Sequence, residues 1–368
     1  MAVYLIIIIV LFTFSLHEQV SKNEKTKKIF LVFSYILMVV IVGLRWETGT
    51  DWEPYLAQFE NSTDLRYMFT YNLGMERGFV LINYLVRIIT PYYSILLFLI
   101  AIVMYFFFMK SFTKLTKYPQ LTNLLFFSST LGLMGSNRQL LAASVIMFGV
   151  TNLIDGKKIN FIFSIVISFF FHTTSLLASV YYFLNRKIKS WILYLSIVIA
   201  FVIGKTQIPV TLFSLFGGLN TYTMEKSDTY LSTAKEVLQT TELSLLGLLK
   251  RLLFLLIFIL IREKVTEKLK HFNLLLNGYV FGTIFYFLFS STLLVMVSRG
   301  SIYFAMMEPL LLTSISYVLK RDIDKLVFLF VMLVLSILLM FQSISPYPDL
   351  FDPYKSIFIN KYFHRFMY

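Results

Sequence analysis

The sequence predicts an all-α polytopic membrane protein with about ten to twelve transmembrane helices and an interfacial helix in its first long outer loop. Of 368 residues, 58% are hydrophobic and 14% are charged, whereas average soluble domains are about 25% charged. Backbone polar groups cannot face lipid unpaired, so long apolar runs must form helices. A transmembrane β-barrel would alternate apolar and polar residues, and runs such as LLFLLIFILI do not. We therefore expect a single integral membrane domain over residues 1–368.

Twelve apolar runs are the candidate spans. Several are shorter than the ~20 residues that cross a bilayer upright, so we expect ten to twelve spans. The first run has no basic residue before its apolar core and no small-residue cleavage site after it, both of which a signal peptide requires. We therefore expect it to be the first span. The candidate spans are residues 1–16, 29–44, 93–109, 121–135, 139–154, 159–171, 174–184, 191–204, 243–261, 272–291, 301–319 and 326–342.

Charge predicts the orientation of these spans. The six links on one side contain 19 of the 33 basic residues and 7 of the 20 acidic ones, which gives them +12 of the formal net charge of +13. By the positive-inside rule these links are cytoplasmic and the N-terminus is outside. Topology thus explains the basic excess without a nucleic-acid partner. The links are residues 17–28, 110–120, 155–158, 185–190, 262–271 and 320–325.

Arginine is concentrated away from the cytoplasmic links. Arginine stays charged and holds phosphate through a planar fork of donors. Topology does not require arginine on the outer side, so its presence there indicates an anionic ligand, with chance as the alternative. The outer and membrane-embedded arginines are Arg45, Arg66, Arg77, Arg87, Arg138, Arg251, Arg299 and Arg365.

Two outer segments, 45–92 and 205–242, are much longer than the cytoplasmic links. Loops beyond about 12–15 residues are usually functional or disordered. Within the first, residues 75–89 have helical periodicity, with Glu76 and Arg87 on the polar face, which predicts an amphipathic interfacial helix. We expect the second segment to be a mobile loop with one short helix near residues 229–240.

The motif GLRWETGTDWEPY places four charged side chains within nine residues at the outer end of the second span. Arg45 is a candidate phosphate ligand, and Asp51 a candidate base or hydrogen-bond acceptor. The pair Asp51-x-Glu53 also suits a divalent cation bound with a substrate phosphate. The alternative is that the aromatic residues of the motif form an interfacial belt and the charges are solvated. The four charged residues are Arg45, Glu47, Asp51 and Glu53.

Arg138 and His172 are further candidates. Ser136 or Asn137 can cap a helix, which places Arg138 in its first turn. Free N–H groups and the helix dipole attract anions there. An arginine in that turn is unfavourable for the helix itself, which favours a function in binding an anion. His172 lies beside hydroxyl residues in FFFHTTS; histidine suits proton transfer near neutral pH, although a structural role is the alternative.

Three cations lie within or next to predicted spans. Lys250 and Arg251 interrupt one apolar run, and Arg299 begins another with Tyr303 one turn later. Charge inside a membrane generally faces a polar interior, so we expect Glu308 to pair with one of these cations. The chain has no cysteine, no phosphate-binding glycine loop, no HExxH and no GxSxG, which leaves thiol, nucleotide-hydrolysing and serine-nucleophile chemistry without support.

At these motifs the chain resembles the EpsG family of Wzy-like exopolysaccharide and O-antigen polymerases. The resemblance implies a GT-C-like fold and a glycosyltransferase of the bacterial inner membrane that is metal-independent and has no cofactor. It implies undecaprenyl-pyrophosphate-linked repeat units as substrates, with membrane lipids and a chain-length regulator protein as further partners. The resembling stretches, in the order of the family, are GLRWETGTDWEPY, ERGFVLINYL, SNRQLLAASVIMFG, FHTTSLL, SRGSIYF and PYPDLFDPYKSIF.

The resemblance also implies roles for individual residues. A growing glycan would leave undecaprenyl pyrophosphate and join an incoming lipid-linked repeat unit on the periplasmic side. Asp51 or His172 would take the acceptor proton. The pyrophosphate would be held by Arg138 and Arg299, with Arg45 or Arg251. Arg251 matches no motif of the family, and it and Tyr303 are included from their local positions alone. The substrate-binding set is then Arg45, Glu76, Arg138, Arg251, Arg299 and Tyr303.

Other classes of protein remain alternatives. A flippase for lipid-linked oligosaccharides would also have many spans and outward cations, but it should show internal repeats, and none is evident. An ion-coupled transporter would need acidic residues in mid-span. A ligase of the O-antigen type, or a metal-dependent mannosyltransferase using Asp51-x-Glu53, is chemically closer.

Overall fold

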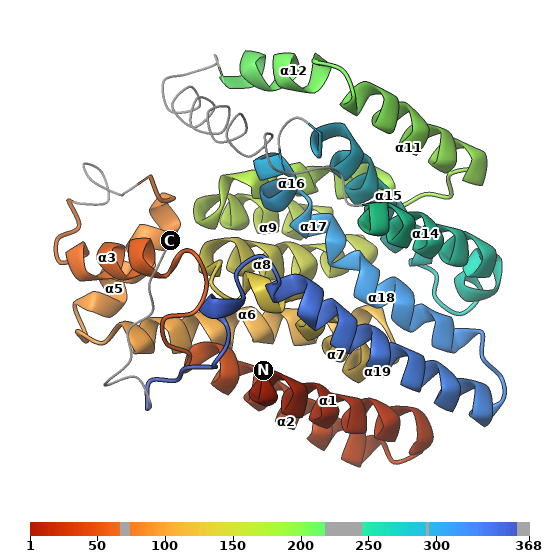
Figure 1. Cartoon of the computed structure of the whole chain (residues 1–368), viewed down its shortest axis with the longest axis horizontal. Helices are drawn as coiled ribbons and strands as arrows, with labels where there is room; N and C mark the ends of the chain where they lie inside the picture. Colours follow the sequence, from red (N-terminus) through yellow and green to blue (C-terminus); the bar gives the residue numbers. More distant parts are fainter. Residues whose placement is uncertain (67–73, 218–244, 292–293, 359–368) are drawn as a thin grey trace. The chain divides into compact units, whose positions relative to one another are not determined.

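The computed structural model describes residues 1–66, 74–217, 245–291 and 294–358, and all regular secondary structure in these ranges is helical (Figure 1). Within the same ranges, β pairing is limited to an isolated antiparallel bridge between Arg45 and Ser356. The predicted all-α fold is confirmed. The short helix expected near residues 229–240 lies outside the described residues.

The chain divides into two compact units, Met1–Leu176 with Leu319–Tyr368, and Leu177–Val318. The first unit contains the motifs that hold Arg45, Asp51, Glu76, Arg138 and His172. Its α-helices are α1 (Ala2–Val20), α2 (Glu24–Gly43), α3 (Trp52–Asn61), α5 (Arg77–Arg87), α6 (Tyr93–Leu115), α7 (Pro119–Thr130), α8 (Asn137–Ile154), α9 (Lys158–Phe171) and α19 (Asp322–Ile344).

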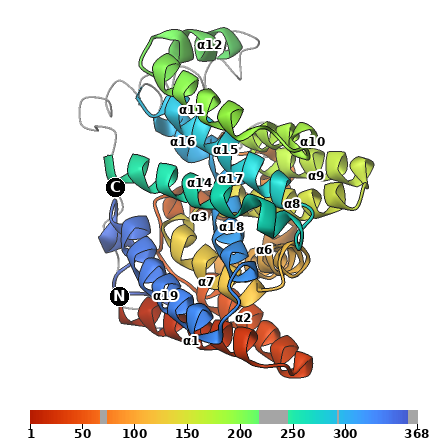
Figure 2. The same cartoon turned by 90° about the vertical axis from the view of Figure 1, so that its right-hand side faces the viewer.

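The helices of the first unit pack as sequential neighbours with α19 added from the end of the chain. Helix α1 packs against α2, α7 and α19, and α6 packs against α2 and α8 (Figure 2). Asn23 caps α2 by accepting hydrogen bonds from the Lys25 and Thr26 N–H groups at 3.0 and 3.3 Å. Helices α3 and α5 contact each other at one end of this unit (Figure 1). The first long outer segment therefore contains ordered helices.

In the second unit, α15 is the central helix and packs against α10, α11, α14, α16, α17 and α18. Residues 301–319, expected as one span, are instead divided into α17, α18 and a 3-10 turn at Ile315–Tyr317. Proline has no N–H, so Pro309 cannot donate to the carbonyl of Ala305, and α17 ends at that residue. The α-helices are α10 (Tyr181–Leu184), α11 (Ser190–Gly204), α12 (Ile208–Gly217), α14 (Leu245–Thr266), α15 (Phe272–Phe289), α16 (Leu294–Gly300), α17 (Ile302–Ala305) and α18 (Met307–Ser314).

Five helices in the described part of the chain are long and apolar enough to cross a membrane. They are α1, α2, α6, α15 and α19. On α19, Val331, Val334 and Leu338 are 53–60% exposed, as expected of side chains that face lipid. A total of ten to twelve spans and the orientation of the chain stay predictions. The amphipathic stretch at residues 75–89 contains α5, and its location at the membrane interface also stays a prediction.

Candidate functional site

The segment after α2 is fixed by the C-terminal segment of the chain. The Trp46 N–H donates to the Lys355 carbonyl at 3.1 Å, and the Ile357 N–H donates to the Leu44 carbonyl at 3.0 Å. Lys355 Nζ also lies 2.8 Å from Glu47 Oε2, with both side chains buried. Glu47 adopts a φ of +40°, a left-handed conformation that is uncommon for a residue other than glycine. Backbone pairing and a buried ion pair thus hold the motif in place.

Removing the Lys355 amine should destabilise the protein strongly. In Lys355→Met, Glu47 would be left as a buried charge without its cation, which costs about 3–5 kcal/mol of stability. We expect a clear fall in the thermal unfolding midpoint of the detergent-purified protein. The double variant Glu47→Gln with Lys355→Met should recover most of that loss. Equal instability of the single and double variants would show that packing, and not charge, is what Lys355 contributes.

Arg45 is 1% exposed and directs its two terminal nitrogens at protein acceptors, while its buried Nε has no hydrogen-bond partner among the described residues. Its guanidinium donates to the Val42 carbonyl and to Oδ1 of Asn137. Asn137 is the residue before Arg138 on α8. Burial lowers the pKa of Arg45, and nearby tyrosines such as Tyr93 oppose that shift. The structure therefore shows Arg45 joining α2 to the start of α8, and its predicted contact with a substrate stays a prediction.

Two glycines allow the motif to cross the start of α8. Gly49 has a φ of +89°, a conformation that side chains rarely adopt. A Cβ at Gly49 would lie 2.5 Å from the Gly135 Cα, and one at Gly135 would lie 2.7 Å from the Gly49 Cα. The loop before Asp51 therefore touches the loop before Arg138 backbone to backbone, which brings these two residues into one site.

Arg138 is the centre of the polar cluster in the first unit. Its Nε donates to the Tyr55 hydroxyl at 3.2 Å, and its Nη1 forms an ion pair with Glu76. The guanidinium carbon also lies 5.3 Å from the centre of the Tyr55 ring. The Arg138 and Glu76 side chains are 14% and 5% exposed. No described residue accepts a hydrogen bond from Nη2, so protein groups orient the guanidinium through Nε and Nη1.

Asp51 and the segment after α9 complete this cluster. Tyr55 donates from its hydroxyl to Asp51 Oδ2 at 3.2 Å, while the Thr173 N–H donates to Glu76 Oε1 at 3.2 Å. The chain of contacts therefore runs from Asp51 through Tyr55, Arg138 and Glu76 to Thr173. His172, the neighbour of Thr173, is 4% exposed.

His172 is oriented by local contacts. Its N–H donates to the Ser168 carbonyl at 2.9 Å, which ends α9. Its ring Nδ1 lies 2.8 Å from the Thr174 hydroxyl, and the tautomer decides which of the two donates. The His172 ring thus contacts one of the hydroxyl residues that follow it in FFFHTTS.

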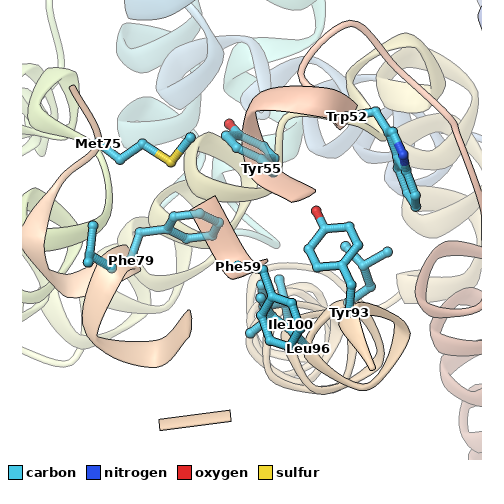
Figure 3. Packing of buried hydrophobic residues seen from close by; sticks show 10 residues of the cluster. Trp52, Tyr55, Phe59, Met75, Phe79, Tyr93, Leu96 and Ile100 are labelled. Carbon is cyan, nitrogen blue, oxygen red and sulfur yellow. The ribbon is translucent and has the colours of Figure 1, made fainter. Parts of the chain in front are cut away.

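Tyr55 also belongs to a cluster of buried aromatic and aliphatic side chains (Figure 3). Edge-to-face and tilted ring contacts connect its members, as aromatic pairs prefer: the ring centres of Tyr55 and Phe79 are 5.2 Å apart, and those of Trp52 and Tyr93 are also 5.2 Å apart. These rings fix α3 and α5 on α6. The cluster therefore sets the position of Tyr55 and, through it, that of Asp51 and Arg138. Its buried members are Trp52, Tyr55, Phe59, Met75, Phe79, Val80, Tyr93, Leu96, Leu97 and Ile100.

Arg251, Arg299 and Tyr303 belong to the second unit. The Arg251 guanidinium carbon lies 3.7 Å from the centre of the Tyr286 ring, a cation–π contact. Arg299 is half-buried in the last turn of α16. Tyr303 is 1% exposed, and its carbonyl accepts a hydrogen bond from the Tyr181 hydroxyl at 2.9 Å.

The expected pairing of Glu308 with one of the cations in the apolar runs is confirmed. Lys250 Nζ lies 3.1 Å from Glu308 Oε1, and the two side chains are 24% and 14% exposed. The pair explains how a carboxylate is tolerated in this apolar unit, because burial of an unpaired charge is costly.

The sequence does not predict the roles of Tyr55 and Lys355 in the site. The sequence pattern places Tyr55 in an aromatic belt, yet its hydroxyl links Asp51 to Arg138. Its spacing of four from Asp51 on a helix would have placed the two on one face. Lys355 lies in a motif that carried no assigned role. Among the described residues no three His, Asp or Glu side chains form a group that could hold a metal ion.

The helices and the cluster define an integral membrane protein whose first unit holds an oriented arginine beside two carboxylates. A family model described as the EpsG family matches residues 28–356. The chain belongs to the EpsG family, which is associated with exopolysaccharide biosynthesis. A search of curated proteins found no match to this chain, and a search of solved structures found none.

Proposed function

We propose that this protein is a polysaccharide polymerase of the bacterial inner membrane. It transfers a growing glycan from undecaprenyl pyrophosphate to an incoming lipid-linked repeat unit on the periplasmic face. The observation that supports this most is the Arg138 fork, which Tyr55 and Glu76 orient beside Asp51. Family membership supports the pathway, and the apolar helices support the membrane setting.

The reaction exchanges one bond at the anomeric carbon of the donor glycan. A hydroxyl oxygen of the acceptor sugar forms a new bond to that carbon. The bond from the same carbon to the pyrophosphate oxygen breaks, and its electron pair leaves with the undecaprenyl pyrophosphate. The acceptor hydroxyl loses its proton to a base of the protein. Catalysis therefore needs a base near the acceptor and a cation near the leaving group.

Arg138 is the proposed cation. Negative charge grows on the pyrophosphate as the bond breaks, so a fixed donor aimed at it lowers the barrier. Tyr55 holds Nε and Glu76 holds Nη1 of the guanidinium, which leaves Nη2 for the anion. The start of α8 adds free N–H groups. In this assignment Glu76 is a positioning residue that fixes Arg138.

Asp51 is the base that the geometry favours over His172. Asp51 is half-buried at the residue before α3, and the Tyr55 hydroxyl donates to its carboxylate at 3.2 Å. The His172 side chain is buried, at 4% exposed, so an acceptor sugar reaches it less easily. His172 then positions the Thr173 N–H that contacts Glu76.

The remaining predicted residues have different support. Arg45 is proposed as a positioning residue, because its donors go to Val42 and Asn137 in the buried interior. Arg299 is a proposed substrate contact on the strength of its family motif alone. Arg251 lies in no such motif and is proposed because it is a cation within an apolar run, and Tyr303 because it lies one turn after Arg299. A chain-length regulator is likewise a proposed partner.

The test is an assay with purified protein and a defined undecaprenyl-pyrophosphate-linked repeat unit in detergent or vesicles. We expect a ladder of lipid-linked products that grows by whole repeat units, without added nucleotide sugar. Activity should persist in the presence of a chelator. Movement of intact single units across vesicles without ladder formation would indicate a flippase, and transfer of finished glycan to a lipid core would indicate a ligase.

A further inference from the structure

A long apolar groove in the first unit has no assigned role. It encloses about 800 Å³ between α5, α6, α8 and α9, within the range of about 300–1,000 Å³ found for small-molecule sites. Its lining is apolar apart from Asn152, Asn160 and Ser164. A second hollow of about 510 Å³ adjoins it, because Ile82, Ile167 and Phe171 line both.

Arg138 lies at one end of the helix stripe that lines the groove. On α8 the lining residues are Leu141, Val145, Phe148 and Asn152, at offsets of 3, 7, 10 and 14 from Arg138. This spacing places them with Arg138 on one face of the helix. From Leu141 to Asn152 the stripe runs about 16 Å along α8 at 1.5 Å per residue. The groove therefore begins one turn from the arginine fork.

Two other walls of the groove reach the same polar cluster. On α9 the groove is lined as far as Phe171, two residues before the Thr173 N–H that contacts Glu76. On α5, Arg77 lines the second hollow and follows Glu76 directly. All three helices thus bring the apolar lining to the Glu76–Arg138 pair.

The α6 wall of the groove is shared with the aromatic and aliphatic cluster. Leu96 and Ile100 of α6 belong to both (Figure 3). The same packing that positions Tyr55 therefore shapes one wall of the groove. Helix α5 approaches α9 closely at Gly78, where a Cβ would lie 2.7 Å from the Phe170 carbonyl oxygen, and both residues line the second hollow.

We propose that this groove binds the polyprenyl chain of the lipid-linked phosphate, with the phosphate at Arg138 and the isoprene units along α8. The inference rests on the proposed function for the identity of the lipid. Charge complementarity argues for this occupant. An apolar groove that begins one turn from an oriented guanidinium and a helix N-terminus, with Arg77 lining the adjoining hollow, matches a long hydrocarbon with an anionic head.

The test is photolabelling with undecaprenyl phosphate that carries a diazirine near the head of its isoprenoid chain. The protein is reconstituted in vesicles of phosphatidylethanolamine and phosphatidylglycerol, and labelled peptides are identified by mass spectrometry. We expect label on α6, α8 and α9, displaced by excess unlabelled undecaprenyl phosphate and far less by added phosphatidylglycerol.

Two adjacent residues on α9 provide a matched pair of variants. Ile167 lines the groove and is 48% exposed, while Val166 lies outside it and is 47% exposed. Ile167→Trp should fill the groove and lower labelling about tenfold, or about 1.4 kcal/mol. Val166→Trp should leave labelling unchanged. Because both sites are half exposed, neither change should prevent folding.

The outcomes separate the groove from the catalytic proposal. Equal displacement by phosphatidylglycerol, or normal labelling of Ile167→Trp, would overturn the groove as a polyprenyl site. Specific labelling in a protein that forms no polymer would retain the groove and contradict the polymerase. Polymerisation by a protein that shows no specific labelling would support the polymerase and contradict the groove as a polyprenyl site.

Discussion

Arg138→Ala should abolish long-chain polymer while lipid-linked single repeat units accumulate. The change removes the donors proposed to stabilise the leaving pyrophosphate, and loss of one such donor commonly lowers turnover about 10²–10³-fold. Product ladders from the reconstituted assay, together with lipid-linked intermediates extracted from cells, measure both effects.

Three variants control for folding and charge in this experiment. Arg138→Ala also leaves Glu76 as a buried carboxylate without its cation, so Arg138→Lys is compared, which keeps the charge but lacks the planar fork. Arg138→Lys should fold, and its polymerising activity should remain far below that of the wild-type protein. Glu76→Gln should lose less activity than either. Arg66→Ala changes an arginine whose side chain is 90% exposed and should form normal ladders. Normal ladders in Arg138→Ala would contradict the assignment of Arg138.

Asp51→Asn should lower the rate of glycan transfer about 10²–10⁴-fold, the usual contribution of a positioned acid or base. The amide keeps the size of the side chain and can still accept the Tyr55 hydrogen bond, so the site should stay folded. Because Asp51 is assigned to the acceptor proton, binding of the lipid-linked donor should be nearly unchanged. Initial rates and a separate donor-binding measurement distinguish the two quantities.

The matched variant is His172→Gln, which keeps a polar group for Thr174. We expect a smaller loss of activity, with some loss of stability because His172 lies at the end of α9. A stable His172→Gln protein that loses activity as fully as Asp51→Asn would transfer the role of base to His172. Near-normal activity of Asp51→Asn would remove Asp51 from the reaction.

Sequence motifs located individual functional candidates but not their partners. The position of Arg138 in the first turn of a helix follows from SNRQLL, because a capping residue precedes an apolar helical run. Its ion pair with Glu76 spans 62 residues of sequence, and the hydrogen bond from Arg45 to Asn137 spans 92. Periodicity describes neighbours within one helix, so it carries no information about such distant pairs.

Local rules also explain where a run expected to be one helix is divided. The run 301–319 is mostly apolar, which predicts one span, yet the missing N–H of Pro309 ends α17 at Ala305. Hydropathy averages over a window and does not register the loss of one hydrogen bond. The same averaging hides Tyr55, whose ring suits an interfacial belt but whose hydroxyl links Asp51 to Arg138.

By itself, the sequence determined the class of the protein, because only helices can satisfy the backbone of its apolar runs in lipid. The distribution of basic residues predicts an orientation for these helices. Hydropathy and charge are both summed over short stretches of sequence, so they can be evaluated without the tertiary structure. Tertiary structure alone decided that Lys355 meets Glu47 across 308 residues, that two glycines bring the loops before Asp51 and Arg138 together, and that a groove begins beside the arginine. These depend on how helices pack, because close contact between distant segments is set by the shapes of both surfaces.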